Sequence, residues 1–335
     1  MSETEAFGAD SSQLLEPPSR LGRLIKGSGW LLTGFFFLLF FTLLKLPDDR
    51  IAPFIDAKIQ EQLRGTGMSY SATRTRLKIG LGLTYVLENA TLNLPPPSGS
   101  YYFDKVSISP TFLSLLTGKL GADVEITGGK GVADLSVTAN QSSQSVSFKL
   151  KDIAIGEFGK APGSNEPPPP IDFMNPNPMT ILANLKKSGS LSGSGSFSGN
   201  FAVPNSLDGQ ASLAINKLLL DQQSLMGFAL PRMAVSESKA EVSIGKGKLL
   251  FKDVKLGKSP ADDLRATLTG DMVLGKQWDT SVMNAKVTFS LSETVMKALV
   301  LIDALLAPGK QPDGSYSYTI NGALNGPPVA APAGK

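Results

Sequence analysis

The stretch DDLRATLTGDMVLGKQWDTSVMNAKVTFSLSETV, residues 262–295, decides the fold. Its apolar residues take alternate positions in two runs, first Leu264, Ala266, Leu268, Met272 and Leu274, and then Met283, Ala285, Val287, Phe289 and Leu291. Alternation with a period of two is typical of a β-strand with one apolar and one polar face. The turn-forming residues between the runs predict an antiparallel pair.

The same alternation recurs along most of the chain after residue 66. Further runs lie at 81–87, 90–94, 124–126, 133–137, 146–150, 211–215, 240–244 and 316–324. The apolar parity changes near Glu88 and Asn89, which predicts a bulge or turn there. In SGSLSGSGSFSGNF, residues 188–201, three apolar residues share one parity, so we expect a weak strand of small residues. The predicted fold class is mainly β, an antiparallel meander forming a curved sheet or groove with a few short capping helices.

A second stretch, GSGWLLTGFFFLLFFTLL at 27–44, predicts one N-terminal transmembrane helix. It has no charge and no proline, and it is about long enough for the hydrocarbon core of a bilayer. The predicted anchor residues are Trp30, Leu31, Leu32, Phe35, Phe36, Phe37, Leu38, Leu39, Phe40, Phe41, Leu43 and Leu44. Because Arg20, Arg23 and Lys26 precede the span, we expect a cytoplasmic N-terminus and an exported C-terminal part.

A cleaved signal peptide is the alternative to an uncleaved anchor. About 26 residues precede the span, and KLPDDRIAPF after it offers no cleavage site with small residues. The sequence therefore favours the uncleaved anchor.

Helical spacing predicts three helices outside the span. Ile51, Phe54, Ile55, Ile59 and Leu63 form an apolar stripe that could plug one end of the sheet, with Asp48 or Asp49 as the cap and Gly65 at the end. A second helix is expected to start at Ser109-Pro110 and to stop at Gly118. The third covers 292–307 after a capping box at Ser290–Glu293, and it is apolar on nearly all sides. Its stripe of Val295, Leu299, Ile302 and Leu306 is a candidate contact for an apolar partner or lipid.

These features divide the chain into seven parts. Residues 1–26 are a cytoplasmic tail, 27–46 the transmembrane helix, and 47–65 a juxtamembrane amphipathic helix. The exported meander has an N-terminal half at 66–155 and a C-terminal half at 181–326, separated by a linker at 156–180 that is rich in proline. Residues 327–335 are expected to be a disordered tail.

Composition argues against catalysis and against nucleic acid. The 335 residues include no cysteine and no histidine, and the net charge is only +3. The GKGK at 245–248 lacks the spacing of a phosphate loop and reads as a hairpin turn. Asp262 and Asp263 would point to opposite faces of a strand, so a solvated turn is the better interpretation. We therefore expect no enzyme, no catalytic or metal-binding residues and no cofactor.

The apolar parity leaves two interpretations open, a closed core or an open curved sheet whose apolar face forms a groove for acyl chains. Both bury the same residues, and we expect the closed or mostly closed core.

The order of the segments resembles a known family of envelope proteins. VSISPTFLSLLTGKLGADVEITGGKGVADLSV, residues 106–137, is similar to a signature of AsmA-like periplasmic proteins. GKLLFKDVKLG, the 262–295 stretch and SYSYTINGALNGP resemble the N protein of the type II secretion system, in its deltaproteobacterial form. No functional site residue carries over, because that pattern consists of structural positions.

The resemblance implies a single-pass protein of the bacterial inner membrane with a periplasmic domain. It would be an accessory of type II secretion that binds and positions partners without chemistry of its own. The alternative is an AsmA-like module that binds or transfers lipid. The expected partners are the bilayer and other secretion-system or envelope proteins, with lipid as a further partner under the alternative. No nucleic acid is expected.

Overall fold

The computed structural model describes residues 48–79, 82–94, 100–111, 118–140, 142–160, 185–225, 228–298, 304–324 and 329–333. None of the helices within these ranges is long and apolar enough to cross a membrane. The predicted tail and span at 1–46, with the topology residues Arg20, Arg23 and Lys26, lie outside the described residues.

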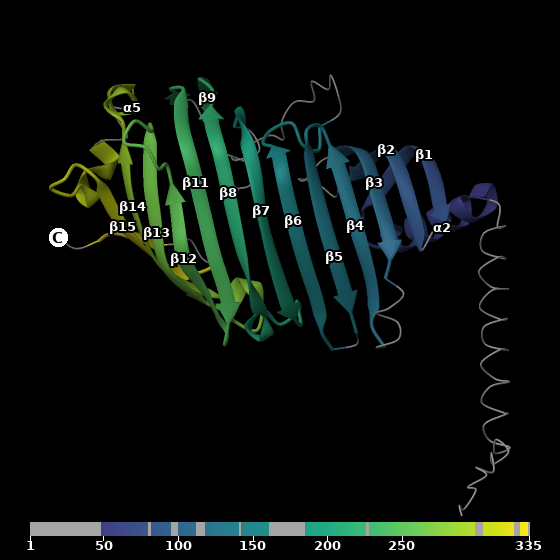
Figure 1. Ribbon diagram of the computed structural model, residues 1–335. Coiled ribbons are helices and arrows are strands. Elements are labelled where there is room, and N and C mark those ends of the chain that lie inside the picture. Colours follow the sequence, from purple (N-terminus) through teal and green to yellow (C-terminus); the bar gives the residue numbers. More distant parts are fainter. Residues whose placement is uncertain are drawn as a thin grey trace, which may run out of the picture. The chain divides into compact units, whose positions relative to one another are not determined.

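Fourteen strands form one antiparallel sheet and follow one another almost in chain order (Figure 1). This confirms a mainly β fold built as an antiparallel meander. The strands are β1 (Ser69–Ile79), β2 (Leu83–Asn93), β3 (Ser100–Pro110), β4 (Leu120–Gly128), β5 (Gly131–Ala139), β6 (Gln144–Ala154), β7 (Lys187–Gly199), β8 (Asp208–Leu220), β11 (Met233–Gly245), β12 (Lys248–Leu256), β13 (Leu264–Val273), β14 (Val282–Leu291), β15 (Tyr316–Ala323) and β16 (Val329–Pro332). A separate small hairpin, β9 (Gln223–Leu225) with β10 (Phe228–Leu230), lies between β8 and β11 in the chain.

The sheet continues from β6 to β7, the two strands on either side of residues 161–184. Val146 pairs with Phe197 and Gln144 with Gly199. β7 is the predicted strand of small residues, which is confirmed. Residues 155–160, the start of the predicted linker, form a turn in which the Gly159 carbonyl accepts a hydrogen bond from the Tyr102 N–H at 2.7 Å.

Two of the residues with positive φ, Lys246 and Asn89, stand where a turn and a parity change were predicted. Lys246 (φ 52) and Gly247 (φ 71) join β11 to β12, which confirms the hairpin turn in GKGK. In β2, Asn89 has φ 51 between the paired residues Glu88 and Ala90. Asparagine tolerates this region better than most residues, so it lets the apolar parity change within the strand.

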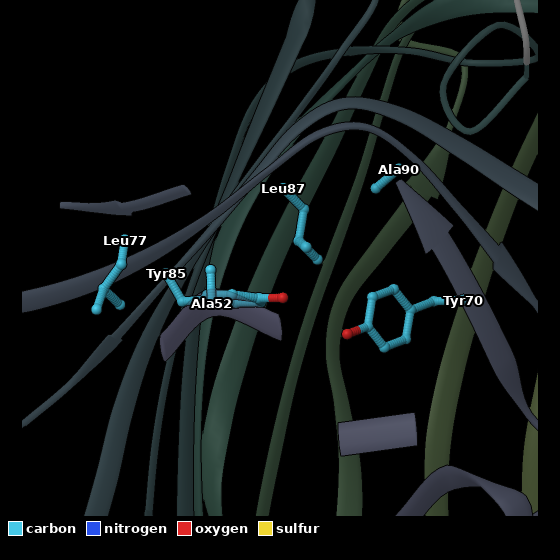
Figure 2. Packing of buried hydrophobic residues seen from close by; sticks show 6 residues of the cluster. All are labelled: Ala52, Tyr70, Leu77, Tyr85, Leu87 and Ala90. Carbon is cyan, nitrogen blue, oxygen red and sulfur yellow. The ribbon is translucent and has the colours of Figure 1, made fainter. Parts of the chain in front are cut away.

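Helix α2 (Asp48–Arg64) packs on the sheet next to β1. Ala52 joins a buried cluster with Tyr70, Leu77, Tyr85, Leu87 and Ala90, shown in Figure 2. Ile55, Ile59 and Leu63 also pack against this cluster, which confirms most of the predicted stripe. Phe54 is the exception at 66% exposed, because it lies roughly 200° around the helix from Ala52.

The prediction of a helix start at Ser109-Pro110 is wrong. Both residues belong to β3, where Ser109 pairs with Asp123 and Pro110 with Ala122. The proline ends the strand, where its missing N–H is tolerated, so strand pairing outweighs the local helix signal. Residues 112–117 lie outside the described part.

The third predicted helix begins later than its capping box suggests. Ser290 still belongs to β14, and α5 spans Glu293–Ala298. The cap is Ser292, whose Oγ accepts a hydrogen bond from the Val295 N–H at 3.4 Å. Residues 304–306 are helical, the 3-10 turn η3 follows at Ala307–Gly309, and 299–303, with Leu299 and Ile302, lie outside the description.

Asp262 is buried, and both Asp262 and Asp263 accept hydrogen bonds from distant segments of the chain, which corrects the prediction of a solvated turn. Asp262 is 7% exposed and accepts hydrogen bonds from the N–H and Oγ of Ser236 and from the Ser259 N–H, each at 2.8 Å. Asp263 accepts from the Ala234 N–H at 2.8 Å and from Ser292 Oγ at 2.7 Å. The two carboxylates thus hold the part of β11 before Ser238, which β12 does not reach, to the start of α5.

Burial alone would raise the pKa of Asp262. The hydrogen bonds donated to it by Ser236, Ser259 and the Lys258 backbone outweigh burial and hold the pKa below its ordinary value.

The sheet is open among the described residues. β1 pairs only with β2 and β16 only with β15, so no strand pair closes the sheet. The expectation of a closed core is therefore not met.

Candidate binding face

One face of the sheet is apolar across its whole width, because the strand registers align the apolar parities. From β4 to β15 one row of paired residues is Val124, Leu135, Phe148, Gly195, Ala211, Val242, Phe251, Gly270, Ala285 and Ile320. The next row is Ile126, Ala133, Leu150, Gly193, Leu213, Ala240, Val254, Leu268, Val287 and Tyr318. Neither row contains a charged residue. We call this surface the apolar face.

The opposite face, which we call the polar face, carries the charges and hydroxyls of the same strands. Its ion pairs include Lys105–Glu125 at 2.8 Å, Lys239–Glu241 at 2.6 Å and Lys255–Asp253 at 2.8 Å. β7 adds five serines at alternate positions from Ser190 to Ser198. Such a face is an ordinary solvated surface, so the two faces differ sharply in what they can bind.

Four pieces of chain cover the apolar face at its margins. α2 covers it beside β1, as described above. The turn before β8 and the turn after β13 place Leu207 and Leu274 against Ile244 and Met272. At the other end, Tyr318 donates a hydrogen bond to the Leu306 carbonyl at 2.9 Å, and Gly309 lies against the Tyr318 ring.

The middle of the apolar face is only half-buried. Along β4–β8 and β11–β13, the strands pack mainly on their neighbours in the sheet, with no second layer among the described helices and strands. Leu135, Phe148, Leu213 and Phe251 all keep part of their surface accessible, and Val137 is 36% exposed. A contiguous apolar patch of this extent marks a surface that binds something.

In this middle region, glycines leave space above the sheet that neighbouring aromatic rings occupy. A Cβ at Gly195 would lie 2.7 Å from the Phe148 ring, and one at Gly209 would lie 2.7 Å from the Phe197 ring. The two rings therefore lie across neighbouring strands, stacked with their centroids 6.4 Å apart. The glycines thus leave room for aromatic rings to lie against neighbouring strands on the apolar face.

Ser238 is a buried polar residue on this face. It pairs with Ile215 and Leu256, is 6% exposed, and its Oγ has no hydrogen-bond partner among the described residues. A buried hydroxyl without a partner costs on the order of 1–3 kcal/mol. Sequence reasoning missed this position because a serine at an apolar parity looks unremarkable in a strand.

The structure describes two of the four candidate contact residues at 292–307, Val295 and Leu306, and they differ in burial. Val295 has no exposed surface, so it is a core residue and offers nothing to a ligand. Leu306 is half-buried and supplies its carbonyl to Tyr318. The floor of the apolar face comes instead from β4–β13, whose alternation predicted the apolar face but did not show that it stays uncovered.

No metal centre is apparent in the described ranges, where no three or more aspartates and glutamates gather closely enough to hold an ion. A shallow hollow of about 550 Å³ lies on the polar face of β1–β5. Its lining includes the paired Lys105 and Glu125 and also Asp123, which accepts a hydrogen bond from Ser136. Lys105 and Glu125 neutralise each other, whereas Lys78, which also lines the hollow, has no ion pair with another described side chain.

No protein-family model, no curated protein and no solved structure matches this chain.

Proposed function

We propose that this protein is an envelope module that binds the acyl chains of lipids along the apolar face. The observation that supports this proposal most directly is the apolar face itself. Its two rows of uncharged residues cross the sheet, and they are half-exposed in the middle and covered at the margins. Burying one methylene group is worth about 0.8 kcal/mol, so a chain lying on this floor gains affinity without any specific polar contact. No chemistry by the protein itself is part of the proposal.

The dimensions of the uncovered floor suit an acyl chain. From β4 to β13 the sheet has seven spacings between strands, and at about 4.8 Å each they extend about 34 Å. The hydrocarbon core of a bilayer, which two opposed layers of acyl chains fill, is about 30 Å thick. An extended chain therefore fits within the floor.

The setting of this module is the second part of the proposal. The uncharged stretch at 27–44 and the basic residues before it support an anchor in the bacterial inner membrane with the sheet in the periplasm. Fourteen strands give thirteen spacings, about 62 Å in total, which is short for spanning an envelope alone. This length favours an accessory role among other envelope proteins, and the resemblance to the type II secretion N protein suggests that machine.

Photocrosslinking in cells tests the proposal on one strand. A photoreactive residue in place of Val137 faces the apolar side, and one in place of Ser136 faces the polar side of the same β5. In cells with radiolabelled phospholipid, we expect lipid to crosslink at position 137 and little at position 136.

Equal lipid labelling at both positions, or none at either, would overturn acyl-chain binding. A protein adduct at position 137 without lipid would instead show that a partner protein covers the apolar face.

A further inference from the structure

Among the described strands, the sheet has one long edge without a partner strand. β1 pairs with β2 through Ser69–Ile79, and no described strand pairs with its other side. The opposite edge is blunted, because β16 has only four residues and ends at Pro332. An edge strand with free N–H and C=O groups can accept a strand from another chain.

The polar face of β1 is basic along this edge. Arg74, Arg76 and Lys78 follow at alternate positions, so they share one face. Glu88 on β2 lies 3.4 Å from one nitrogen of Arg76, whereas Arg74 and Lys78 have no ion pair or hydrogen bond with another described side chain. The Nε of Arg76 is buried and also lacks a partner.

The positive charges of Arg74, Arg76 and Lys78 determine which kind of strand can pair with the edge of β1. A second copy of the chain, pairing β1 with β1, would place cations opposite cations, which destabilises a strand pair. A strand with carboxylates at alternate positions would place an anion beside each unpaired cation. Its other parity would face the side of the sheet where Leu77 and Tyr70 are buried.

We propose that the free edge of β1 binds an extended segment of a partner protein in which acidic and apolar residues alternate. The segment adds a fifteenth strand to the sheet, held by backbone hydrogen bonds and by the pairing of its carboxylates with Arg74 and Lys78. This interaction is independent of acyl-chain binding on the apolar face.

Two synthetic peptides of eleven residues test the proposal against the full-length protein in detergent. One alternates valine with glutamate, and the other alternates valine with lysine. We expect the acidic peptide to bind about tenfold or more tightly than the basic one, since two cross-strand pairs change from attraction to repulsion. Hydrogen exchange should slow at the amides of residues 69–79 when the acidic peptide binds.

The double variant Arg74→Glu with Lys78→Glu should reverse this preference. A matched double variant, Lys149→Glu with Lys286→Glu, makes the same charge change on the polar face away from the edge and should leave the preference intact. Binding of neither peptide, protection elsewhere in the sheet, or an unchanged preference in the Arg74/Lys78 variant would overturn the proposal. A dimer of the protein alone that crosslinks through β1 would overturn it as well.

Discussion

At the scale of single residues, polar ties between distant segments hold α2 to the sheet. Asp56 on α2 accepts hydrogen bonds from the hydroxyls of Tyr70 and Tyr85, the latter at 3.2 Å. The two tyrosines are 9% and 3% exposed. Burial, together with the hydrogen bond to Asp56, raises the pKa of Tyr70 far above its ordinary value.

This shift predicts a loss of stability at alkaline pH. The unfolded chain releases the Tyr70 proton near pH 10, whereas the folded protein retains it, so the free energy of unfolding falls as pH rises above about 10. The contribution of the group is complete below that pH, and its slope above it is at most about 1.4 kcal/mol per pH unit. Tyr70→Phe should weaken this dependence in denaturant titrations between pH 8 and 11.

Tyr101→Phe is the matched control, since it removes the same hydroxyl from a side chain that is 39% exposed and leaves the rest of the chain unchanged. If both variants keep the full alkaline loss, Tyr70 is not its source.

Hydrogen bonds between residues far apart in the chain were the feature that the sequence predicted least well. Asp262 and Asp263 looked like a solvated turn because their partners, Ser236 and Ala234, lie more than twenty-five residues earlier in the chain. Only the fold brings them together. The parity change at Asn89, in contrast, was predicted because both the alternation and the residue type signal it locally.

At the scale of elements, alternation located the strands well and helix signals did less well. The runs in 262–295 became β13 and β14 with the predicted parity, since Phe289 faces Tyr316 and Tyr318 at centroid distances of 5.3 and 6.3 Å. The Ser109-Pro110 signal failed because strand pairing with β4 overrides a local propensity. Tertiary context, absent from a local pattern, decides such cases.

The parity of β14 gives a direct test of the two faces. Phe289→Asp puts a carboxylate among stacked rings on the apolar face, and it should lower the free energy of unfolding by about 3 kcal/mol or more. Thr288→Asp places the same group on the polar face and should cost less than about 1 kcal/mol. Urea unfolding of both variants measures the difference, and similar losses would refute the assignment of faces.

At the scale of the whole molecule, alternation alone could not distinguish an open sheet from a closed core. Both arrangements place the same residues on the apolar side. The distinction comes from the strand order, in which β1 and β16 each have one neighbour, and from the absence of a second layer over β4–β8 among the described elements. Sequence therefore predicted the floor of the candidate site but not its exposure.

β6 pairs with β7 along most of its length, with one register shift between Leu150 and Ile153. This pairing predicts that the sheet holds together without the chain connection at 161–184. A protease site engineered there should be cleavable without separating the two fragments, because β6 and β7 remain paired from Val146–Phe197 to Ala154–Ser190. We expect the fragments to elute together in gel filtration in detergent and to separate in denaturant. Elution of the fragments apart under native conditions would show that the chain connection is needed.

A sheet in which each strand packs mainly on its neighbours can change length without redesign. Loss or gain of one strand would send the rest of the chain in the opposite direction, whereas a hairpin of two strands preserves both direction and parity. Each added hairpin would lengthen the apolar face by roughly 10 Å. Evolution can therefore adjust the reach of such a protein by duplicating hairpins, and related proteins should differ in size by even numbers of strands.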